Sequence, residues 1–168
     1  MFITELLSIF STKRGGINLN LSNNELNGFK SFQVGQALQG SIERGEDLLE
    51  SLEEIIIKAE IEAGFVQVLG AVKKARMGYF NQSSMEYEIH EFNKPMEILH
   101  CMGNISLSQE EKPTLHAHIV LGDNGGNAFG GHLEKGTEVF VAETIIQEYH
   151  GKPQQRKKDP ESGLTLWR

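Results

Sequence analysis

The fold of this chain is decided by the stretch Thr114-Leu115-His116-Ala117-His118-Ile119-Val120-Leu121 and by Gly130-Gly131-His132 a short way beyond it. Polar and apolar side chains alternate along the first segment, which is typical of a β-strand buried on one face. Residues two apart on a strand share a face, so His116 and His118 would stand roughly 6 to 7 Å apart at their Cα atoms. The glycine-rich segment 122–126 predicts a hairpin that brings His132 back beside them.

The three histidines are therefore candidate ligands of one metal ion. Imidazoles in this arrangement can converge on an ion at roughly 2.0–2.1 Å each, and three of them without a fourth protein ligand resemble an open site. We expect one divalent metal per subunit, with zinc favoured over nickel, iron or manganese. The alternative is that they are ordinary polar residues on a half-buried sheet.

Composition sets the protein class. A chain of 168 residues is ordinarily one domain with a real core. Its net charge of −7 disfavours DNA binding by the surface as a whole, and the short basic run 156–158 is interpreted as a solvated tail.

Cys101 is the only cysteine, so no internal disulfide can form. The apolar segment 1–10 is too short to span a membrane, so we expect a cytoplasmic protein without a membrane partner.

The chain divides into three parts. Residues 1–31 are rich in turn formers and are expected to be an N-terminal extension. The compact domain is expected over 32–150, beginning with a strand that runs from Phe32 to Ile42. Residues 151–168 contain two prolines and many charges, which predicts an irregular C-terminal tail that packs back on the domain through 163–167.

One long amphipathic helix is predicted after Gly45, where Glu46 and Asp47 suit the positive end of a helix. Gly64 is placed to end it. The apolar residues recur at helical spacing and are Leu48, Leu49, Leu52, Ile55, Ile56, Ala59 and Ala63.

Beyond Gly64 the hydrophobic period changes to two, which predicts strands. We expect them at 65–72, 76–80, 84–92, 95–107, 114–121, 129–133 and 138–147. The predicted fold class is α+β: a strongly bent, mostly antiparallel β-sheet whose open face is covered by the single helix.

An ordered set of motifs resembles the plant-and-prokaryote conserved (PPC) domain family over about residues 33–150. The motifs are Arg44-Gly45-Glu46-Asp47, Gly70-Ala71-Val72, Gly78-Tyr79-Phe80, Pro95-Met96-Glu97-Ile98-Leu99, Gly103-Asn104-Ile105-Ser106, His116-Ala117-His118, Gly130-Gly131-His132 and Glu143. The resemblance implies a trimeric assembly. It also implies a fold similar to acetolactate decarboxylase, with metal ligands at His116, His118 and His132.

In plants the PPC domain follows an AT-hook, a short Arg-Gly-Arg-Pro-centred element that enters the minor groove. This sequence contains no such element. Because the arginines of the hook read the narrow groove, we expect the DNA affinity to belong to the hook. Direct DNA binding is therefore not expected here, and any role in DNA regulation would come through protein partners.

Other polar residues have two interpretations each. Glu97 and Glu143 lie in apolar runs and could handle protons beside a metal, or they could lie on a wet face or in an intersubunit contact. Asn104 could bind an anion or stabilise a turn. Gly130 and Gly131 are expected to line the site and let the backbone approach it closely.

Two functions follow from these residues. The first is a metal-binding homotrimer with a regulatory or interaction role. The second is a metal-dependent enzyme, a lyase or hydrolase, that acts on a small oxygen-rich substrate; its metal would polarise a carbonyl or activate water.

Overall fold

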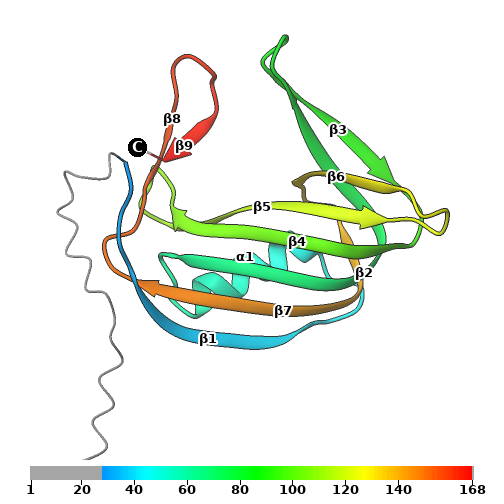
Figure 1. Cartoon of the computed structure of the whole chain (residues 1–168), viewed down its shortest axis with the longest axis horizontal. Coiled ribbons are helices and arrows are strands. Elements are labelled where there is room, and N and C mark those ends of the chain that lie inside the picture. The colour runs from blue at the N-terminus through cyan, green and yellow to red at the C-terminus, as the bar shows by residue number, and fades with distance from the viewer. Residues whose placement is uncertain (1–27, 168) are drawn as a thin grey trace, which may run out of the picture.

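A computed structural model describes residues 28–167, so most of the predicted N-terminal extension lies outside the described residues. Within this part, one helix and nine strands follow one another along the chain (Figure 1). They are β1 (Gln33–Ile42), α1 (Leu48–Lys58), β2 (Gly64–Asn81), β3 (Glu86–Phe92), β4 (Met96–Leu107), β5 (Pro113–Gly122), β6 (Ala128–Leu133), β7 (Glu138–His150), β8 (Arg156–Lys158) and β9 (Thr165–Trp167). The predicted α+β class with one main helix is confirmed. No helix of the described part is both long and apolar enough to cross a membrane.

Seven strands form one antiparallel sheet in the order β1-β7-β2-β4-β5-β6, with β3 paired to β2. β2 has 18 residues, and its first half lies between β7 and β4. Its second half pairs with β3 and also with β6, so that β2, β4, β5 and β6 close on themselves. This closure bends the sheet strongly. The expectation of two separate strands at 65–72 and 76–80 is wrong, because the chain continues through both as a single strand.

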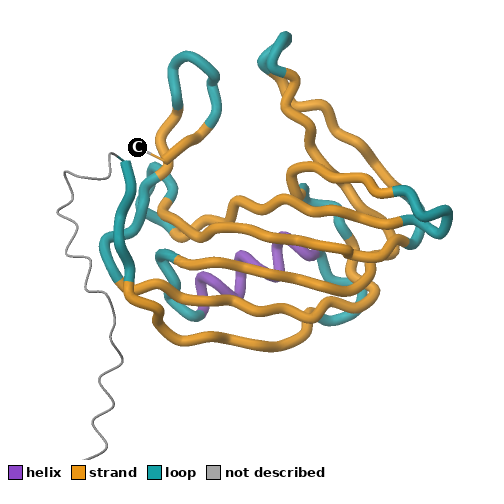
Figure 2. The backbone as a smooth tube through the Cα atoms, viewed as in Figure 1, coloured by secondary structure: helices purple, strands orange, loops and turns teal. Residues whose placement is uncertain are grey.

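The start of α1 agrees with the sequence pattern. Asp47 caps it, with a side-chain oxygen that accepts from the backbone N–H of Glu50 at 3.0 Å. One face of the helix packs against the sheet and forms part of the core (Figure 2). Its fully buried residues are Leu48, Leu52 and Ile56.

The helix ends at Lys58, five residues before Ala63, the last residue of the helix predicted to stop at Gly64. Glu60 takes the left-handed conformation with φ of 55°. The backbone N–H of Ile61 then donates to the carbonyl of Ile56 at 3.1 Å, and that of Glu60 donates to Ile57 at 3.1 Å. These two bonds form a Schellman motif, which usually has glycine at the position that Glu60 occupies. The glycine-based prediction was wrong for that reason, and Gly64 begins β2 instead.

β5 contributes one face to the core and the other to the outer side of the sheet. Leu115, Ala117, Ile119 and Leu121 are buried in the core. The intervening residues, which include His116 and His118, point to the opposite face because side chains alternate along a strand. The core therefore fixes the strand that carries two of the three histidines.

The C-terminal tail is not irregular as predicted. β8 and β9 pair as a small antiparallel hairpin, and Leu107 of β4 joins its base by donating a backbone hydrogen bond to Gln154 at 3.0 Å. Figure 1 shows this hairpin and the β2–β3 hairpin projecting from the same side of the molecule.

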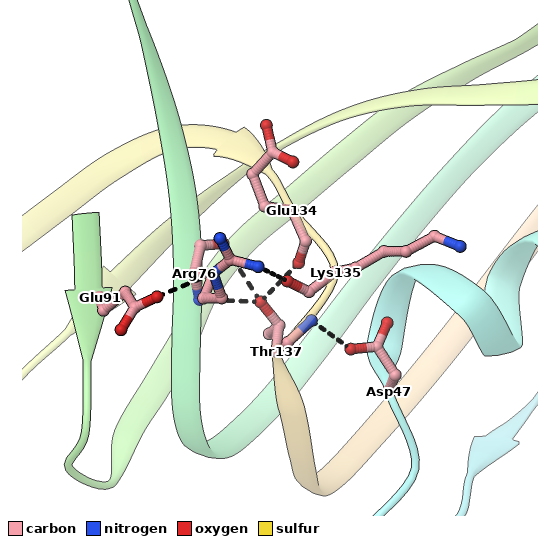
Figure 3. Close-up of polar contacts among 7 residues, drawn as sticks. Asp47, Arg76, Glu91, Glu134, Lys135 and Thr137 are labelled. Atoms are coloured by element: carbon pink, nitrogen blue, oxygen red, sulfur yellow. Dashed lines mark hydrogen bonds and ion pairs between the residues drawn. The ribbon is translucent and has the colours of Figure 1, made fainter. Parts of the chain in front are cut away.

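A polar cluster fixes the connection from β6 to β7 (Figure 3). The buried hydroxyl of Thr137 accepts from the backbone N–H of Arg76 at 3.1 Å. The Arg76 guanidinium donates to the carbonyl of Lys135 at 3.0 Å. Asp47 accepts from the backbone N–H of Gly136 at 2.6 Å, so the same turn is tied to the start of α1. These bonds hold the chain just after His132.

Candidate metal centre

The three predicted histidines lie together on two neighbouring strands. His116 and His118 belong to β5, and His118 lies directly opposite His132 of β6 in the register. Candidate ligand nitrogens of the three rings all lie within 4.8 Å of one another. The ring centroids are 5.0 to 5.6 Å apart. The sequence prediction of a three-histidine cluster is thus confirmed as geometry.

Two of the rings, those of His116 and His132, are in a form suited to metal binding. Burial, followed by the positive charge of Arg156, lowers the pKa of His116 to about 4. Burial is also the main cause that lowers the pKa of His132. Both are therefore neutral near pH 7, and neutral imidazole is the form that binds metals. Among the residues that the structure describes, none hydrogen bonds to the buried Nδ1 of His132. An orphaned buried nitrogen within the cluster fits a site built for a metal ion.

Glycines allow β6 to approach β2 closely beside the cluster. His132 pairs with Gly78 of β2 on the side away from β5. A Cβ on Gly131 would lie 2.7 Å from the carbonyl oxygen of Gly78, whereas one on Gly130 would lie 3.3 Å from that of Ile119. Gly131 thus lets β6 approach β2 closely. The predicted role of Gly130 and Gly131 in lining the site is not seen in the cleft described next, which neither glycine lines.

A cleft of about 430 Å³ opens over two of the histidines. Its walls come from β3, from β5 and the loop before it, from β6 and the connection that follows it, and from the β8–β9 hairpin. The lining residues are Tyr87, Ser108, Thr114, Leu115, His116, His132, Glu134, Arg156, Gly163, Leu164, Thr165 and Leu166. The Tyr87 ring lies 5.7 Å from that of His132, centroid to centroid. Sequence reasoning missed Tyr87 and Glu134 because only the strand topology brings these isolated side chains to the site.

Arg156 is a third residue of the cleft that sequence reasoning did not place there. It was interpreted with Lys157 and Lys158 as part of a solvated tail, but its side chain is buried while the two lysines are exposed. It donates through Nη2 to the side-chain oxygen of Asn104 at 2.6 Å. Asn104 lies within β4 opposite His116, so it does not stabilise a turn. The sequence showed a basic run but not the hairpin that turns one member inward.

The two predicted acidic residues lie away from the cluster within one subunit. Glu97 is five residues along β4 from Met102, the partner of His118, which corresponds to roughly 17 Å of strand. Glu143 lies on β7, which is separated from β5 by β2 and β4, or roughly 14 Å across the sheet. Their predicted proton-handling roles therefore gain no support from the geometry of a single subunit.

Comparisons with known proteins show which family and which solved structures this chain resembles. The sequence profile of the Plants and Prokaryotes Conserved domain, abbreviated PCC or PPC, matches residues 29–150. A metal-containing protein from Archaeoglobus fulgidus is 36% identical with a TM-score of 0.77, covering 82% of this chain and 96% of its own. A PPC protein from Pyrococcus horikoshii is 34% identical with a TM-score of 0.78, covering 83% of this chain and 96% of its own.

More distant matches add less. Acetolactate decarboxylase from Bacillus subtilis is 15% identical with a TM-score of 0.48, covering 75% of this chain and 57% of its own. Among curated proteins, the bifunctional protein GlmU of a Synechococcus strain is 26% identical over 121 residues, 71% of this chain. The chain spans only 18% of the length of that relative.

Proposed function

The chain belongs to the Plants and Prokaryotes Conserved domain family, and on that premise we propose that it is a metal-binding homotrimer with a regulatory or interaction role. His116, His118 and His132 are the proposed ligands of one divalent ion per subunit, with zinc the favoured metal. Bound there, the ion would supply Lewis acidity and an open coordination position.

The observation that carries this proposal is the donor set. The ligand nitrogens of the three imidazoles lie within 4.8 Å of one another, which is close enough for all three to bind one ion. Two of them are kept neutral largely by burial, which removes the proton that would compete with a metal. The similar Archaeoglobus fulgidus protein, named as metal-containing, adds support from outside the chain.

Metal content tests the proposal. We expect near-stoichiometric zinc in protein purified without a histidine tag, and its loss in the double variant His116→Ala/His118→Ala. His90→Ala is the matched control, because His90 lies on β3 outside the cluster. Absence of metal from the parent after growth in metal-replete medium would contradict the proposal, as would metal that persists in the double variant.

The outer face of the sheet supports the proposed trimer. Leu69 and Ile145 line one shallow groove on it and are 47% and 42% exposed. Met102 is 45% exposed and lies in the same cross-strand row as Ile145, since both pair with Gln67. Large apolar side chains gathered on one exposed face are typical of an interface.

Light-scattering mass measurement tests the trimer. We expect three times the 18.8 kDa of one chain for the parent. Ile145→Glu places a charge in the proposed interface and should dissociate the assembly. Ile57→Glu is the control, because Ile57 is 56% exposed on α1, on the other side of the sheet. A monomeric parent, or a trimer unchanged by Ile145→Glu, would refute this assignment.

The cleft favours a second candidate function, a metal-dependent lyase or hydrolase with a small oxygen-rich substrate. Polar groups converge on it beside two of the proposed ligands, and its volume lies within the range of small-molecule sites. A screen of small hydroxy and oxo acids with zinc-loaded protein tests it. Turnover that disappears in a folded His116→Ala trimer would favour the enzyme, and no turnover by the zinc-loaded parent would favour the interaction role.

Direct DNA binding is not part of the proposal, given the net charge of −7. Fluorescence anisotropy with duplex DNA at low ionic strength tests this view. A salt-dependent complex weakened by Lys157→Ala/Lys158→Ala would contradict it.

A further inference from the structure

The β8–β9 hairpin lies outside residues 29–150, the part that matches the family profile. It nevertheless forms one wall of the cleft over the histidines through Leu164, Thr165 and Leu166. Its first strand carries three consecutive cations, of which only Arg156 is buried. The hairpin therefore adds a single positive charge to the cleft.

The contacts of Arg156 hold the guanidinium in place. Nε donates to the hydroxyl of Ser106 at 3.1 Å, and Nη1 donates to the carbonyl of Thr165 at 3.1 Å. Nη2 donates to the side-chain oxygen of Asn104 at 2.6 Å. These three partners are neutral. A guanidinium has five N–H donors, so two of them make no hydrogen bond to a residue that the structure describes and are available to a ligand.

The charge of Arg156 is poorly compensated. Burial lowers the pKa of Arg156, and no acidic group among its described neighbours acts in the other direction. A buried cation whose described hydrogen-bond partners are all neutral is costly, and an anion is the natural complement. Arginine is well suited to this role because its planar donor pairs match two oxygens of one carboxylate or phosphate.

The cation also stands beside the proposed metal ligands. Asn104, which accepts from Arg156, is the cross-strand partner of His116, and both Arg156 and His116 line the cleft. A ligand in this cleft could contact the guanidinium at one end and the open metal position at the other. Glu134 lines the same cleft, which disfavours ligands with two or more negative charges.

We propose that Arg156 recognises an anion in this cleft and that the ligand of the histidine site is a small organic monocarboxylate. The proposal rests on the proposed metal site. It assigns the ligand class from one buried cation, from two of its donors that bind no described residue, and from the carboxylate of Glu134, which lines the same cleft.

Nuclear magnetic resonance titration tests the proposal on zinc-loaded trimer, with the Arg156 Nε–H signal as the readout. Acetate is the carboxylate probe, acetamide its neutral isostere, and inorganic phosphate the alternative oxyanion. We expect saturable binding of acetate that is at least tenfold tighter than that of acetamide, since charge-assisted bonds are worth roughly tenfold or more. Acetamide binding as tight as acetate would overturn the proposal, and tighter binding of phosphate would overturn the choice of a monocarboxylate.

Variants give the decisive comparison, read from amide signals of the cleft. Arg156→Gln should weaken acetate binding at least tenfold, whereas the matched control Lys157→Gln removes an exposed cation from the same strand and should leave it unchanged. Trp167, the only tryptophan, lies 5.6 Å from the Arg156 guanidinium, so its fluorescence reports whether the hairpin stays in place. If Arg156→Gln displaces the hairpin, Arg156→Lys keeps the charge without the planar donors and should still lose several-fold.

The outcomes separate this inference from the proposed function. If every variant retains zinc and acetate binds equally well to the parent and to Arg156→Gln, the role of Arg156 is refuted. The proposed metal site is then unaffected. A parent without zinc refutes the metal site, and the same acetate titration of metal-free protein then decides whether Arg156 binds anions.

Discussion

Replacement of Gly131 by alanine should disrupt the proposed metal site without touching a ligand. The added Cβ would lie 2.7 Å from the carbonyl oxygen of Gly78, about 0.7 Å closer than the 3.4 Å at which ordinary contact begins. That oxygen is backbone and cannot rotate away. The β6 strand must therefore move from β2, and His132 follows Gly131 directly in the chain.

The size of this movement sets the expected effect. Metal–ligand distances tolerate only about 0.2 Å of deviation. A displacement several times larger should weaken zinc affinity by about 10- to 100-fold, the range seen when groups supporting a ligand are changed. Overpacking should also lower the free energy of unfolding by about 1–3 kcal/mol. Competition with a chromophoric chelator measures the affinity, and urea denaturation of metal-free protein measures the stability.

Gly130→Ala is the matched control, since its Cβ would lie 3.3 Å from the nearest atom and needs almost no adjustment. We expect it to bind zinc like the parent. The reasoning fails if Gly131→Ala binds zinc with parental affinity, or if Gly130→Ala is equally damaging.

Three further predictions concern the core and its polar contacts. Burial raises the pKa of the Cys101 thiol to about 12. Labelling of the native protein by a disulfide reagent should therefore stay slow from pH 7 to 9 and become fast only in denaturant. A labelling rate of the native protein that increases with pH would contradict this. Thr137→Val leaves the backbone N–H of Arg76 without its acceptor and should cost about 1–3 kcal/mol in urea denaturation, with Thr137→Ser closer to the parent. Leu52→Ala empties a fully buried position and should cost about 2–5 kcal/mol, whereas Ile57→Ala, exposed on the same helix, should cost far less; equal losses would contradict this packing.

Local patterns predicted much of this architecture. Alternation along β5 identified both a buried face and a face that carries His116 and His118. The turn residues between β5 and β6 predicted a reversal that brings His132 back beside this pair, and the structure shows that it lies opposite His118. These features depend on neighbours in the chain, so a single sequence contains them.

What the sequence did not reveal depends on contacts between distant segments. The burial of Arg156 follows from its bonds to Ser106 and Asn104, fifty or so residues earlier. Likewise the unbroken course of β2 depends on four partner strands rather than on its own composition. The end of α1 was misplaced for a local reason, since Glu60 adopts a conformation that sequence rules assign to glycine.

The proposed site combines two parts with different structural origins. His116, His118 and His132 stand on paired strands whose other faces pack in the core, so their spacing is fixed by the fold of the whole domain. Arg156 comes instead from a hairpin outside the segment that matches the family profile. A change in that hairpin would alter what the cleft binds while leaving the metal ligands in place. This division predicts that, among proteins of this fold, ligand preference depends on the segment after β7. The geometry of the histidines is predicted not to depend on that segment.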